Sequence, residues 1–459
     1  MKLTTTFITL NNGTQICVPE NLKLMSNFVL REQGDWFEDE IHFVRKFIEP
    51  EMITLDIGAN YGLYSTAIAE NLGANGKLWC FEPTQNTADA LRKTISKNNF
   101  DSKIELIQAG LSDHNGHATF YTSPNSELNS LTANDSTTGE KQTIELLTLD
   151  GCFDKYQWKQ IDFIKLDAEG EELNILKAAT NTLSSCSPLI MFELKHGKAV
   201  NIPLINAFKQ LDYQPYYLIP ALNVLCPLDL SQKLDDYQLN LFCCKKETAD
   251  KLAQKGLLVT DPFSQKTKPS NPKNTFFQSL PFSKDIQLSE TSTDEPSNIY
   301  NVTFDAYASS RDDSQNVAER LQHLFMAFEG VKKILAAGES KITRLSTLAR
   351  ISYDLGQRSV GNQILSYIMQ RYIEKGESFE LCEAFIPPSK VFESTSTNKK
   401  HNKEWLLSSV VHELICKHAY SCYFSGADAT KQHFSLLEKY GFLLPDMAKR
   451  KNALEKAYL

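Results

Sequence analysis

The stretch Thr54-Leu55-Asp56-Ile57-Gly58-Ala59-Asn60-Tyr61-Gly62 joins an apolar run to a helix-forming run. Residues 52–57 predict a buried strand, and residues 63–72 predict an α-helix. A strand, a glycine-containing turn and a helix start form a nucleotide-binding corner. Glycine lets the backbone approach a ligand, and the first turn of a helix offers free N–H groups. A second strand, predicted at 77–81, ends at Glu82, whose carboxylate can accept hydrogen bonds from both ribose hydroxyls of an adenosine.

The spacing of the glycines indicates which nucleotide this corner binds. A dinucleotide-binding loop has the pattern Gly-x-Gly-x-x-Gly. Here Gly58 and Gly62 flank Asn60, and Leu63 stands where the last glycine is needed. The loop therefore suits a pyrophosphate poorly and suits an adenosine with a charged amino-acid tail better. Asp56 can meet the ammonium group of that tail, directly or through water, so the predicted ligand is S-adenosylmethionine.

Length and composition bound the class of protein. The chain has 459 residues and a formal net charge of −8, and 42% of its residues are hydrophobic. The length predicts two or three domains, and the absence of a long basic run argues against duplex nucleic acid as the main partner. Ten scattered cysteines without a C-x-x-C pair predict reduced thiols in a cytoplasmic protein, not a disulfide framework or a zinc site. The sequence shows neither a signal peptide nor an apolar run long enough for a transmembrane segment.

The pattern along the chain predicts four parts. These are an N-terminal cap or lid segment (1–50), a cofactor-binding domain (51–250), a linker (251–300) and an irregular α-helical domain (301–459). Residues 7–18 alternate around Asn11-Asn12-Gly13 and predict a β-hairpin. Strand and helix patterns alternate through the second part, as in α/β proteins, and residues 213–218 and 239–244 are expected to close its sheet. Residues 260–295 are rich in Ser, Pro, Lys and Thr, which is typical of a linker.

Helical patterns dominate the last part of the chain. They cover residues 317–335, 341–355, 359–374, 403–423 and 429–440. Residues 348–357 place small and large residues like one unit of a helical-hairpin repeat, but no second copy follows at that period. An irregular helical domain is therefore expected rather than a repeat array.

An acidic and aromatic cluster, residues 32–40, precedes the glycine loop. Two interpretations of it stay open. The acids can favour a helix start through the helix dipole, or the cluster can form a lid over the cofactor or a wall of the substrate site.

Five motifs in a fixed order carry a family resemblance. They are Asp56-Ile57-Gly58-Ala59-Asn60-Tyr61-Gly62, Phe81-Glu82-Pro83, Leu111-Ser112-Asp113 with Gly116, Ile164-Lys165-Leu166-Asp167-Ala168-Glu169-Gly170-Glu171, and Phe192-Glu193. This order resembles the FkbM-type methyltransferase family over roughly residues 25–245. The resemblance implies a class I, Rossmann-like α/β fold with a seven-stranded sheet and helices on both faces. It also implies dependence on S-adenosylmethionine and, usually, methyl transfer to oxygen. Ala168 departs from the family, which more often has a β-branched residue there, and the change concerns packing.

The predicted cofactor-binding residues lie on three of these motifs. They are Asp56, Gly58, Asn60, Gly62, Glu82, Ser112 and Asp113. Ser112 and Asp113 belong to a loop that is expected to lie along the edge of the adenine ring.

Methyl transfer to a hydroxyl needs an in-line approach and a base or metal that takes the proton. The candidates follow two predicted middle strands: Asp167, Glu169, Glu193 and His196. Other interpretations stay open, since Glu169 and Glu171 can instead cap the next helix and His196 can be a hydrogen-bonded structural residue. Lys165 is expected to pair with a carboxylate. A divalent metal is possible at Asp167, Glu169 and Glu193, but no ligand spacing requires one.

The leading functional hypothesis is a cytoplasmic O-methyltransferase acting on a saccharide, a glycan precursor or a related hydroxylated metabolite. The helical domain would then serve homo-oligomer formation or a protein partner. An NAD-dependent oxidoreductase or epimerase is disfavoured by the incomplete glycine pattern and by the lack of a Tyr-x-x-x-Lys pair after the middle strands. A catalytically inactive methyltransferase-fold scaffold is disfavoured by the intact Asp56, Gly58 and Glu82.

Overall fold

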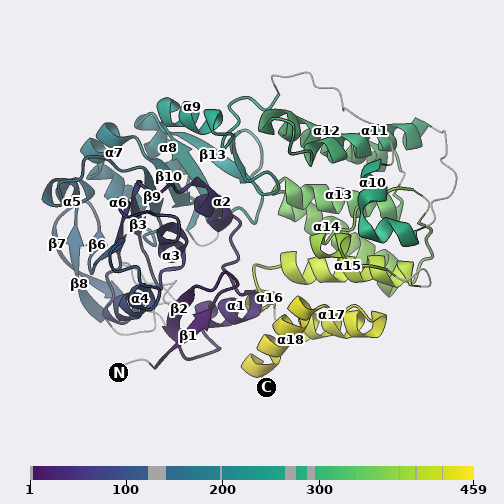
Figure 1. The fold of residues 1–459 in the computed structure, drawn as a ribbon, viewed down its shortest axis with the longest axis horizontal. Helices are drawn as coiled ribbons and strands as arrows, with labels where there is room; N and C mark the ends of the chain where they lie inside the picture. The colour runs from purple at the N-terminus through teal and green to yellow at the C-terminus, as the bar shows by residue number, and fades with distance from the viewer. Residues whose placement is uncertain are drawn as a thin grey trace. The chain divides into compact units, whose positions relative to one another are not determined.

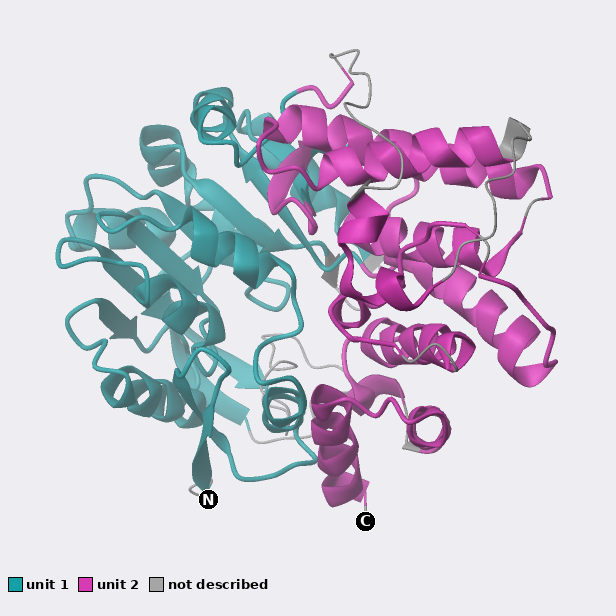
Figure 2. Ribbon diagram, turned by 45° about the vertical axis from the view of Figure 1, so that its right-hand side comes forward, with its two compact units in different colours: residues 1–218, 227–229, 238–260 teal, residues 219–226, 230–237, 261–459 magenta. Residues whose placement is uncertain are grey.

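The computed structural model describes residues 4–121, 141–196, 199–263, 275–286, 295–338, 340–381, 383–397, 401–425 and 427–458. The chain forms two compact units, drawn in two colours in Figure 2. The first unit contains residues 1–218, 227–229 and 238–260, and the second contains residues 219–226, 230–237 and 261–459. The first unit is an α/β structure and the second is mainly helical, which confirms the predicted fold class.

An eight-stranded sheet is the centre of the α/β structure (Figure 1), with the order β14-β13-β15-β10-β9-β3-β4-β5. Its strands are β3 Ile53–Ile57, β4 Lys77–Phe81, β5 Ile104–Ile107, β9 Phe163–Leu166, β10 Leu189–Glu193, β13 Gln214–Ile219, β14 Val224–Pro227 and β15 Asn240–Cys244. β5, β4, β3, β9 and β10 are parallel to one another, and β15 runs antiparallel between β10 and β13. The predicted number of seven strands is wrong by one, because the chain between the two predicted closing strands adds β14.

Helices follow the strands of this sheet. They are α3 Leu63–Ala69, α4 Gln85–Lys97, α5 Leu149–Lys155, α6 Glu172–Lys177, α7 Thr180–Cys186, α8 Ile202–Gln210 and α9 Lys246–Gln254. Every residue of β9 and of β15 is buried. Strands covered on both faces are mostly apolar, and β9 and β15 follow this rule except at Lys165 and Asn240. The sheet order reverses between β3 and β9, and ligands bind open α/β sheets at such a reversal.

The N-terminal segment contains the predicted hairpin. β1 Thr5–Thr9 pairs antiparallel with β2 Gln15–Pro19, which confirms that prediction. Two helices follow, α1 Met25–Gln33 and α2 Glu40–Phe47. Gly34 ends α1 with a left-handed backbone, φ +74°, so most of the acidic and aromatic cluster lies between the two helices.

A three-stranded sheet is added after β5. It contains β6 Gly110–Leu111, β7 Gly116–Tyr121 and β8 Lys141–Leu147, in the order β6-β8-β7. β7 and β8 are antiparallel, and the chain between them, residues 122–140, lies outside the described residues. Phe120, Ile144 and Leu146 are buried in one small apolar cluster of this sheet. A short ladder, β11 Lys195–His196 with β12 Ala199–Val200, follows β10.

The second unit is built mainly from helices. They are α10 Thr275–Ser279, η2 Pro281–Asp285, α11 Glu295–Ser310, α12 Val317–Ala336, α13 Ile342–Asp354, α14 Arg358–Ile368, η3 Met369–Glu374, η4 Lys390–Glu393, α15 Asn402–Lys417, α16 Cys422–Ser425, α17 Ala427–Tyr440 and α18 Pro445–Tyr458. α11 packs against α12, α13 against α14, and α15 against α17 (Figure 1). The five predicted helices are confirmed by α12, α13, α14 with η3, α15 and α17.

The prediction of a linker at 251–300 is wrong where the structure describes it. α9 continues to Gln254, and α10 and η2 bury Phe277 and Phe282 in the helical unit. Aromatic burial requires packing partners, which a flexible linker does not have. Residues 264–274 and 287–294 of the same stretch lie outside the described residues.

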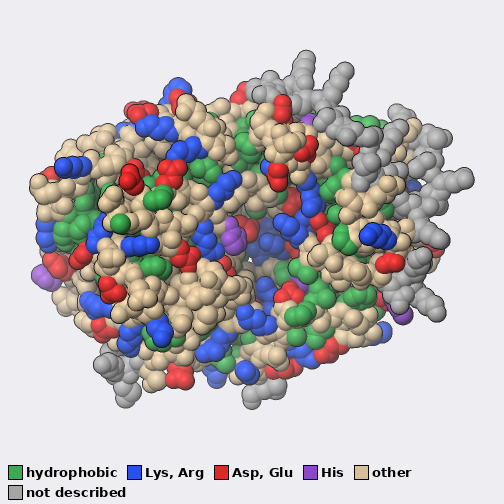
Figure 3. Space-filling model, in the orientation of Figure 1, with side chains coloured by type: hydrophobic (Ala, Val, Ile, Leu, Met, Phe, Trp, Pro, Cys, Tyr) green, Lys and Arg blue, Asp and Glu red, His purple; other side chains and the backbone are tan. Residues whose placement is uncertain are grey.

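The surface carries charges of both signs. On the face drawn in Figure 3, Lys and Arg side chains are interspersed with Asp and Glu. Among the described residues, none of the helices combines the length and apolar character needed to cross a membrane.

Candidate active site

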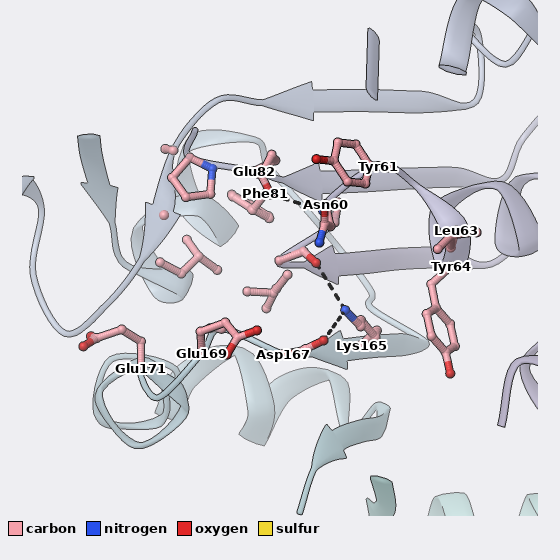
Figure 4. A pocket seen from close by; sticks show the side chains of 18 of the residues that line it. Asn60, Tyr61, Leu63, Tyr64, Phe81, Glu82, Lys165, Asp167, Glu169 and Glu171 are labelled. Atoms are coloured by element: carbon pink, nitrogen blue, oxygen red, sulfur yellow. Dashed lines mark hydrogen bonds and ion pairs between the residues drawn. The ribbon is translucent and has the colours of Figure 1, made fainter. Parts of the chain in front are cut away.

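A pocket in the first unit lies at the carboxyl ends of three adjacent parallel strands, β4, β3 and β9 (Figure 4). Each strand ends in residues that line it. Phe81 and Glu82 come from β4 and its end, Ile57 and Gly58 from the end of β3, and Asp167 follows β9. The pocket therefore lies next to the position where the sheet order reverses.

The turn after β3 needs glycine for two reasons. Gly58 has φ +78°, and a Cβ atom there would lie 1.8 Å from the carbonyl oxygen of Asp167. The backbone N–H groups of Gly58 and Ala59 both donate to the Phe81 carbonyl oxygen at 3.0 Å, which ties the turn to β4. Gly62 precedes α3 with φ +89°, and a Cβ atom there would lie 2.5 Å from Leu91. No other residue type fits either position without moving the backbone or its neighbours.

Glu82 is held rigidly at the pocket wall. Its Oε2 accepts the Asn60 backbone N–H at 3.1 Å, and its Oε1 accepts the Thr84 backbone N–H at 3.0 Å and the Thr84 hydroxyl at 2.6 Å. Burial raises the pKa of Glu82, while these hydrogen bonds from Thr84 and Asn60 act in the opposite direction. A carboxylate offers about four lone-pair positions, so these three hydrogen bonds leave about one position for a ribose hydroxyl.

An apolar wall of the pocket comes from the added sheet. Leu111 on β6, Phe120 on β7, and Ile144 and Leu146 on β8 all line it. An apolar surface beside a fixed carboxylate suits a purine ring attached to a ribose. Leu111 belongs to the loop that was expected at the edge of the adenine, whereas no sequence signal placed β7 and β8 in the pocket.

Two predicted cofactor residues lie outside this wall. Ser112 is buried and donates to Glu171 Oε2 at 2.8 Å. Asp113 is exposed, and its carboxylate is 2.7 Å from His114 Nδ1. Neither residue lines the pocket, because the chain passes the pocket at Ala109, Gly110 and Leu111 and then leaves it. The structure therefore does not support placing Ser112 and Asp113 at the adenine.

Lys165 lies between carboxylates of two strands. Its Nζ is 2.9 Å from Asp167 Oδ2, 3.9 Å from Asp56 Oδ1 and 3.2 Å from the Gly58 carbonyl oxygen. Burial lowers the pKa of Lys165, but Asp167 and Asp56 more than offset this effect, so the pKa is raised and the ammonium stays charged. This agrees with the expected carboxylate pairing of Lys165, and the side chain also lines the pocket.

Asp56 lies beneath the pocket and not in its wall. The Ser65 hydroxyl donates to its Oδ2 at 2.6 Å, while Oδ1 is buried and accepts no hydrogen bond within the protein. A buried acceptor of this kind normally has a partner. Its position fits the predicted interaction with an ammonium group through an intervening water.

The acidic cluster after β9 contains the predicted catalytic residues. Asp167 and Glu169 line the pocket on the same side as Lys165, and Glu82 and Asn60 lie across from them (Figure 4). Glu193 ends β10, beside β9, and does not line the pocket. Burial, followed by the nearby carboxylates, raises the pKa of both Glu169 and Glu193 well above the ordinary range. Both therefore hold their protons near neutral pH.

At the start of α6, Glu171 is the N-cap residue, but its side chain makes no capping hydrogen bond. Glu172 instead accepts the backbone N–H groups of Ala168 and Gly170, at 2.9 and 3.2 Å. Glu169 has a left-handed backbone, φ +50°. His196 belongs to β11, but its side chain lies outside the described residues, so its role stays a prediction.

The acidic and aromatic cluster before α2 forms part of the pocket wall. Trp36 and Glu38 line the pocket, which favours the wall interpretation of this segment. Glu38 Oε1 accepts Trp36 Nε1–H at 3.0 Å, and Oε2 accepts the Tyr64 hydroxyl at 2.6 Å and Asn240 Nδ2–H at 2.9 Å. Burial raises the pKa of Glu38, although the hydrogen bonds from Tyr64 and Trp36 oppose the rise. No sequence signal indicated Tyr64 as a pocket residue or Asn240 as a partner of Glu38.

The comparisons with known proteins give one family match and distant relatives. The model of the methyltransferase FkbM domain matches residues 56–215. The hexuronic acid methyltransferase AglP of Haloferax volcanii is 27% identical over 157 residues, which make up 34% of this chain and 61% of that protein. This chain thus spans less than two thirds of that relative.

Solved structures similar to this chain include two methyltransferases. One is the methyltransferase FkbM from Methylobacillus flagellatus, with TM-score 0.30, 19% identity, and coverage of 43% of this chain and 44% of that chain. The other is the O-methyltransferase from Bacillus cereus in complex with SAH, with TM-score 0.27, 14% identity, and coverage of 45% of this chain and 80% of that chain.

The family match runs from Asp56 to Pro215, so it includes the glycine loop, Glu82 and the acidic cluster after β9. It confirms the resemblance drawn from the five motifs and, with it, S-adenosylmethionine as the cofactor of the family. The chain therefore carries a methyltransferase FkbM domain.

Proposed function

We propose that this chain transfers a methyl group from S-adenosylmethionine to an oxygen atom of a saccharide or a related hydroxylated metabolite. The observation that carries the proposal is a single pocket that joins a ribose-binding carboxylate, Glu82, to a carboxylate at the end of the adjoining strands, Asp167. The cofactor supplies a methyl group on a sulfonium centre. The protein has to bind it, position the acceptor and take one proton.

The cofactor end of the pocket is assigned from its hydrogen-bonding capacity. Glu82 accepts a ribose hydroxyl, and the apolar wall of Phe120, Ile144 and Leu146 covers the adenine. Gly58 lets the backbone approach the cofactor, and the free Oδ1 of Asp56 interacts with the ammonium of the amino-acid tail through water.

Asp167 is assigned to the acceptor. Its carboxylate is exposed to the pocket and is ion-paired with Lys165 at 2.9 Å, with 36% of the side chain exposed. Its neighbours Glu169 and Glu193 hold their protons, because burial raises the pKa of each. Asp167 is then the group in this cluster that orients an acceptor hydroxyl and receives its proton.

Two observations support a saccharide acceptor. The acidic groups Asp167, Glu169 and Glu171 line one side of the pocket, and together they can hydrogen-bond several hydroxyls of one ligand. The relative from Haloferax volcanii is named as a methyltransferase of a hexuronic acid, which is a sugar derivative.

The test is methyl transfer from labelled S-adenosylmethionine to a panel of nucleotide-linked sugars and glycan precursors. With a verified acceptor, Asp167→Asn keeps the shape and removes the charge. Turnover should fall by roughly 10²- to 10⁴-fold, the usual contribution of general acid–base catalysis, while cofactor affinity changes little. Asp113→Asn is the control, because Asp113 is exposed and outside the pocket. Near-parental turnover of Asp167→Asn would place the proton acceptor elsewhere.

A further inference from the structure

A second cluster of ligand-type side chains lies on α15 in the helical unit and shares no residue with the pocket. His412, Glu413 and Cys416 each offer one ligand atom, and these atoms all lie within 4.8 Å of one another. Among the described residues it is the single group of three His, Cys, Asp or Glu side chains with this spacing. The proposed methyl transfer uses none of them.

The spacing of these residues along the helix suits a metal ion. His412 and Cys416 are four residues apart, so they lie on the same face of α15, and His412 Nδ1 is 3.9 Å from Cys416 Sγ. The sequence His412-Glu413-Leu414-Ile415-Cys416 follows the H-E-x-x-H pattern of zinc-binding helices, with cysteine in place of the second histidine. Imidazole nitrogen and thiolate sulfur are the ligands that Zn²⁺ prefers.

A carboxylate on another helix fixes the orientation of the His412 ring. Asp446, in the first turn of α18, accepts from His412 Nε2 at 2.9 Å. Nδ1 is therefore the nitrogen that faces Cys416, and the Ser389 hydroxyl lies 3.0 Å from it. A histidine that ligates a metal through one nitrogen usually donates to a carboxylate through the other.

Glu413 takes no part in the hydrogen-bond network around His412. It is only 8% exposed, and its carboxylate has no hydrogen-bond or ion-pair partner among the described residues. Its carboxylate is therefore available to a metal ion that His412 and Cys416 also hold. One divalent ion would balance the charges of a Glu413 carboxylate and a Cys416 thiolate, with His412 neutral.

We propose that His412, Glu413 and Cys416 bind one divalent transition-metal ion, with zinc as the best match to the ligand set. Asp446 positions His412 and so connects the site on α15 to α18. Binding releases the thiol proton of Cys416 and the Nδ1 proton of the His412 ring to solvent, and no oxidation or reduction takes place. The fourth position is left to water or to the nearby Ser389 hydroxyl.

The experiment is metal binding by the reduced full-length chain after removal of metal with a chelator. Titration with Zn²⁺ should show one tightly bound ion per chain. Titration with Co²⁺ should give a thiolate-to-cobalt charge-transfer band in the near ultraviolet. Asp446→Asn should weaken zinc binding by about 10- to 100-fold, and Cys416→Ser should weaken it further and abolish the charge-transfer band.

The controls separate this site from adventitious metal and from misfolding. His401→Ala removes an exposed histidine near the start of α15 and should leave zinc binding unchanged. Glu413→Gln has nearly the same shape as glutamate, and its circular dichroism should match that of the parent. The proposal is overturned if folded Glu413→Gln and Cys416→Ser bind one zinc ion as tightly as the parent. It is also overturned if the reduced parent binds no stoichiometric zinc.

Discussion

Lys165 faces more negative groups than it can neutralise. Among the described residues that line the pocket it is the one cation, whereas Glu38, Glu82, Asp167, Glu169 and Glu171 all line the same pocket. Glu169 relieves part of this excess, because burial and the nearby carboxylates raise its pKa to about 10 and it keeps its proton at neutral pH. The pocket is therefore less negative at neutral pH than its composition suggests.

A pH dependence of stability follows from Glu169. Its pKa in the folded chain is raised above the value of about 4.3 for an unfolded glutamate. As pH rises above that value, the unfolded state releases its proton first, so the contribution of this group to stability falls until the folded pKa is passed. Glu169→Gln cannot ionise and should lose less thermal stability than the parent between about pH 6 and 9.

The measurement is the unfolding temperature across this pH range, with Glu20→Gln as an exposed control. Equal pH slopes for the parent and Glu169→Gln would show that Glu169 is ionised in the folded chain.

The sequence located some site residues and could not locate others. Glu82, Asp167 and Glu193 follow predicted strands of one parallel sheet, whose carboxyl ends must lie at one edge. No such rule predicts the position of Glu38, because that position depends on hydrogen bonds with Tyr64 and with Asn240. Asn240 is 202 residues away in the chain. The sequence analysis predicted no zinc site, because the chain has no C-x-x-C pair. The proposed ligands His412, Glu413 and Cys416 lie instead close together along helix α15.

At the scale of elements, the turn after β3 depends on close contact with the end of β9. A Cβ atom on Gly58 would lie 1.8 Å from the Asp167 carbonyl oxygen, and φ is +78°. Gly58→Ala should therefore destabilise the fold by about 2–5 kcal/mol, from overpacking together with the unfavourable backbone. It should also abolish cofactor binding, because the two strand ends must separate.

The control is Gly116→Ala on β7, whose added Cβ would meet its nearest atom at 3.6 Å. Chemical denaturation of both variants measures the difference. If Gly58→Ala were as stable as Gly116→Ala, the turn after β3 would accommodate a Cβ atom without any loss in the free energy of unfolding, which would contradict the expectation.

Two elements show why sequence patterns failed locally. The first residues of α11, 295–300, fell within the predicted linker, yet Tyr300 is buried, and so is Tyr307 further along the helix. Tyr300 pairs with Thr347 at 2.9 Å, and Tyr307 donates to Asp354 at 2.7 Å, each 47 residues further along the chain. The sequence did not predict β14, because this strand forms by lying beside β13 in the sheet and its four residues carry no distinctive pattern.

At the scale of the whole molecule, the chain enters the second unit twice before residue 261. Residues 219–226 and 230–237 belong to that unit. Ala221 N–H donates to the Asp354 carbonyl oxygen at 3.1 Å, and Asp235 accepts the Ser359 backbone N–H at 2.8 Å. The C-terminal part is therefore not a simple appendage beginning near residue 260.

A chain ending at Thr260 tests this organisation. It should still bind cofactor, because every residue that lines the pocket belongs to the first unit. It should also unfold at a lower temperature, because Ala221 and Asp235 lose their hydrogen bonds with Asp354 and Ser359. Scanning calorimetry with and without cofactor measures both effects. An unchanged unfolding temperature, or loss of cofactor binding by a folded chain, would contradict the expectation.

The most direct test of the central claim is calorimetric titration of the full-length chain with S-adenosylmethionine and, separately, with NAD. We expect one S-adenosylmethionine bound per chain and no binding of NAD. Glu82→Gln should weaken the cofactor by about 1.5–3 kcal/mol, the value of a hydrogen bond to a charged group, with its unfolding temperature measured alongside because Glu82 also accepts from Asn60 and Thr84. No binding of S-adenosylmethionine by the folded parent, or equal affinity in folded Glu82→Gln, would contradict the assignment of this pocket.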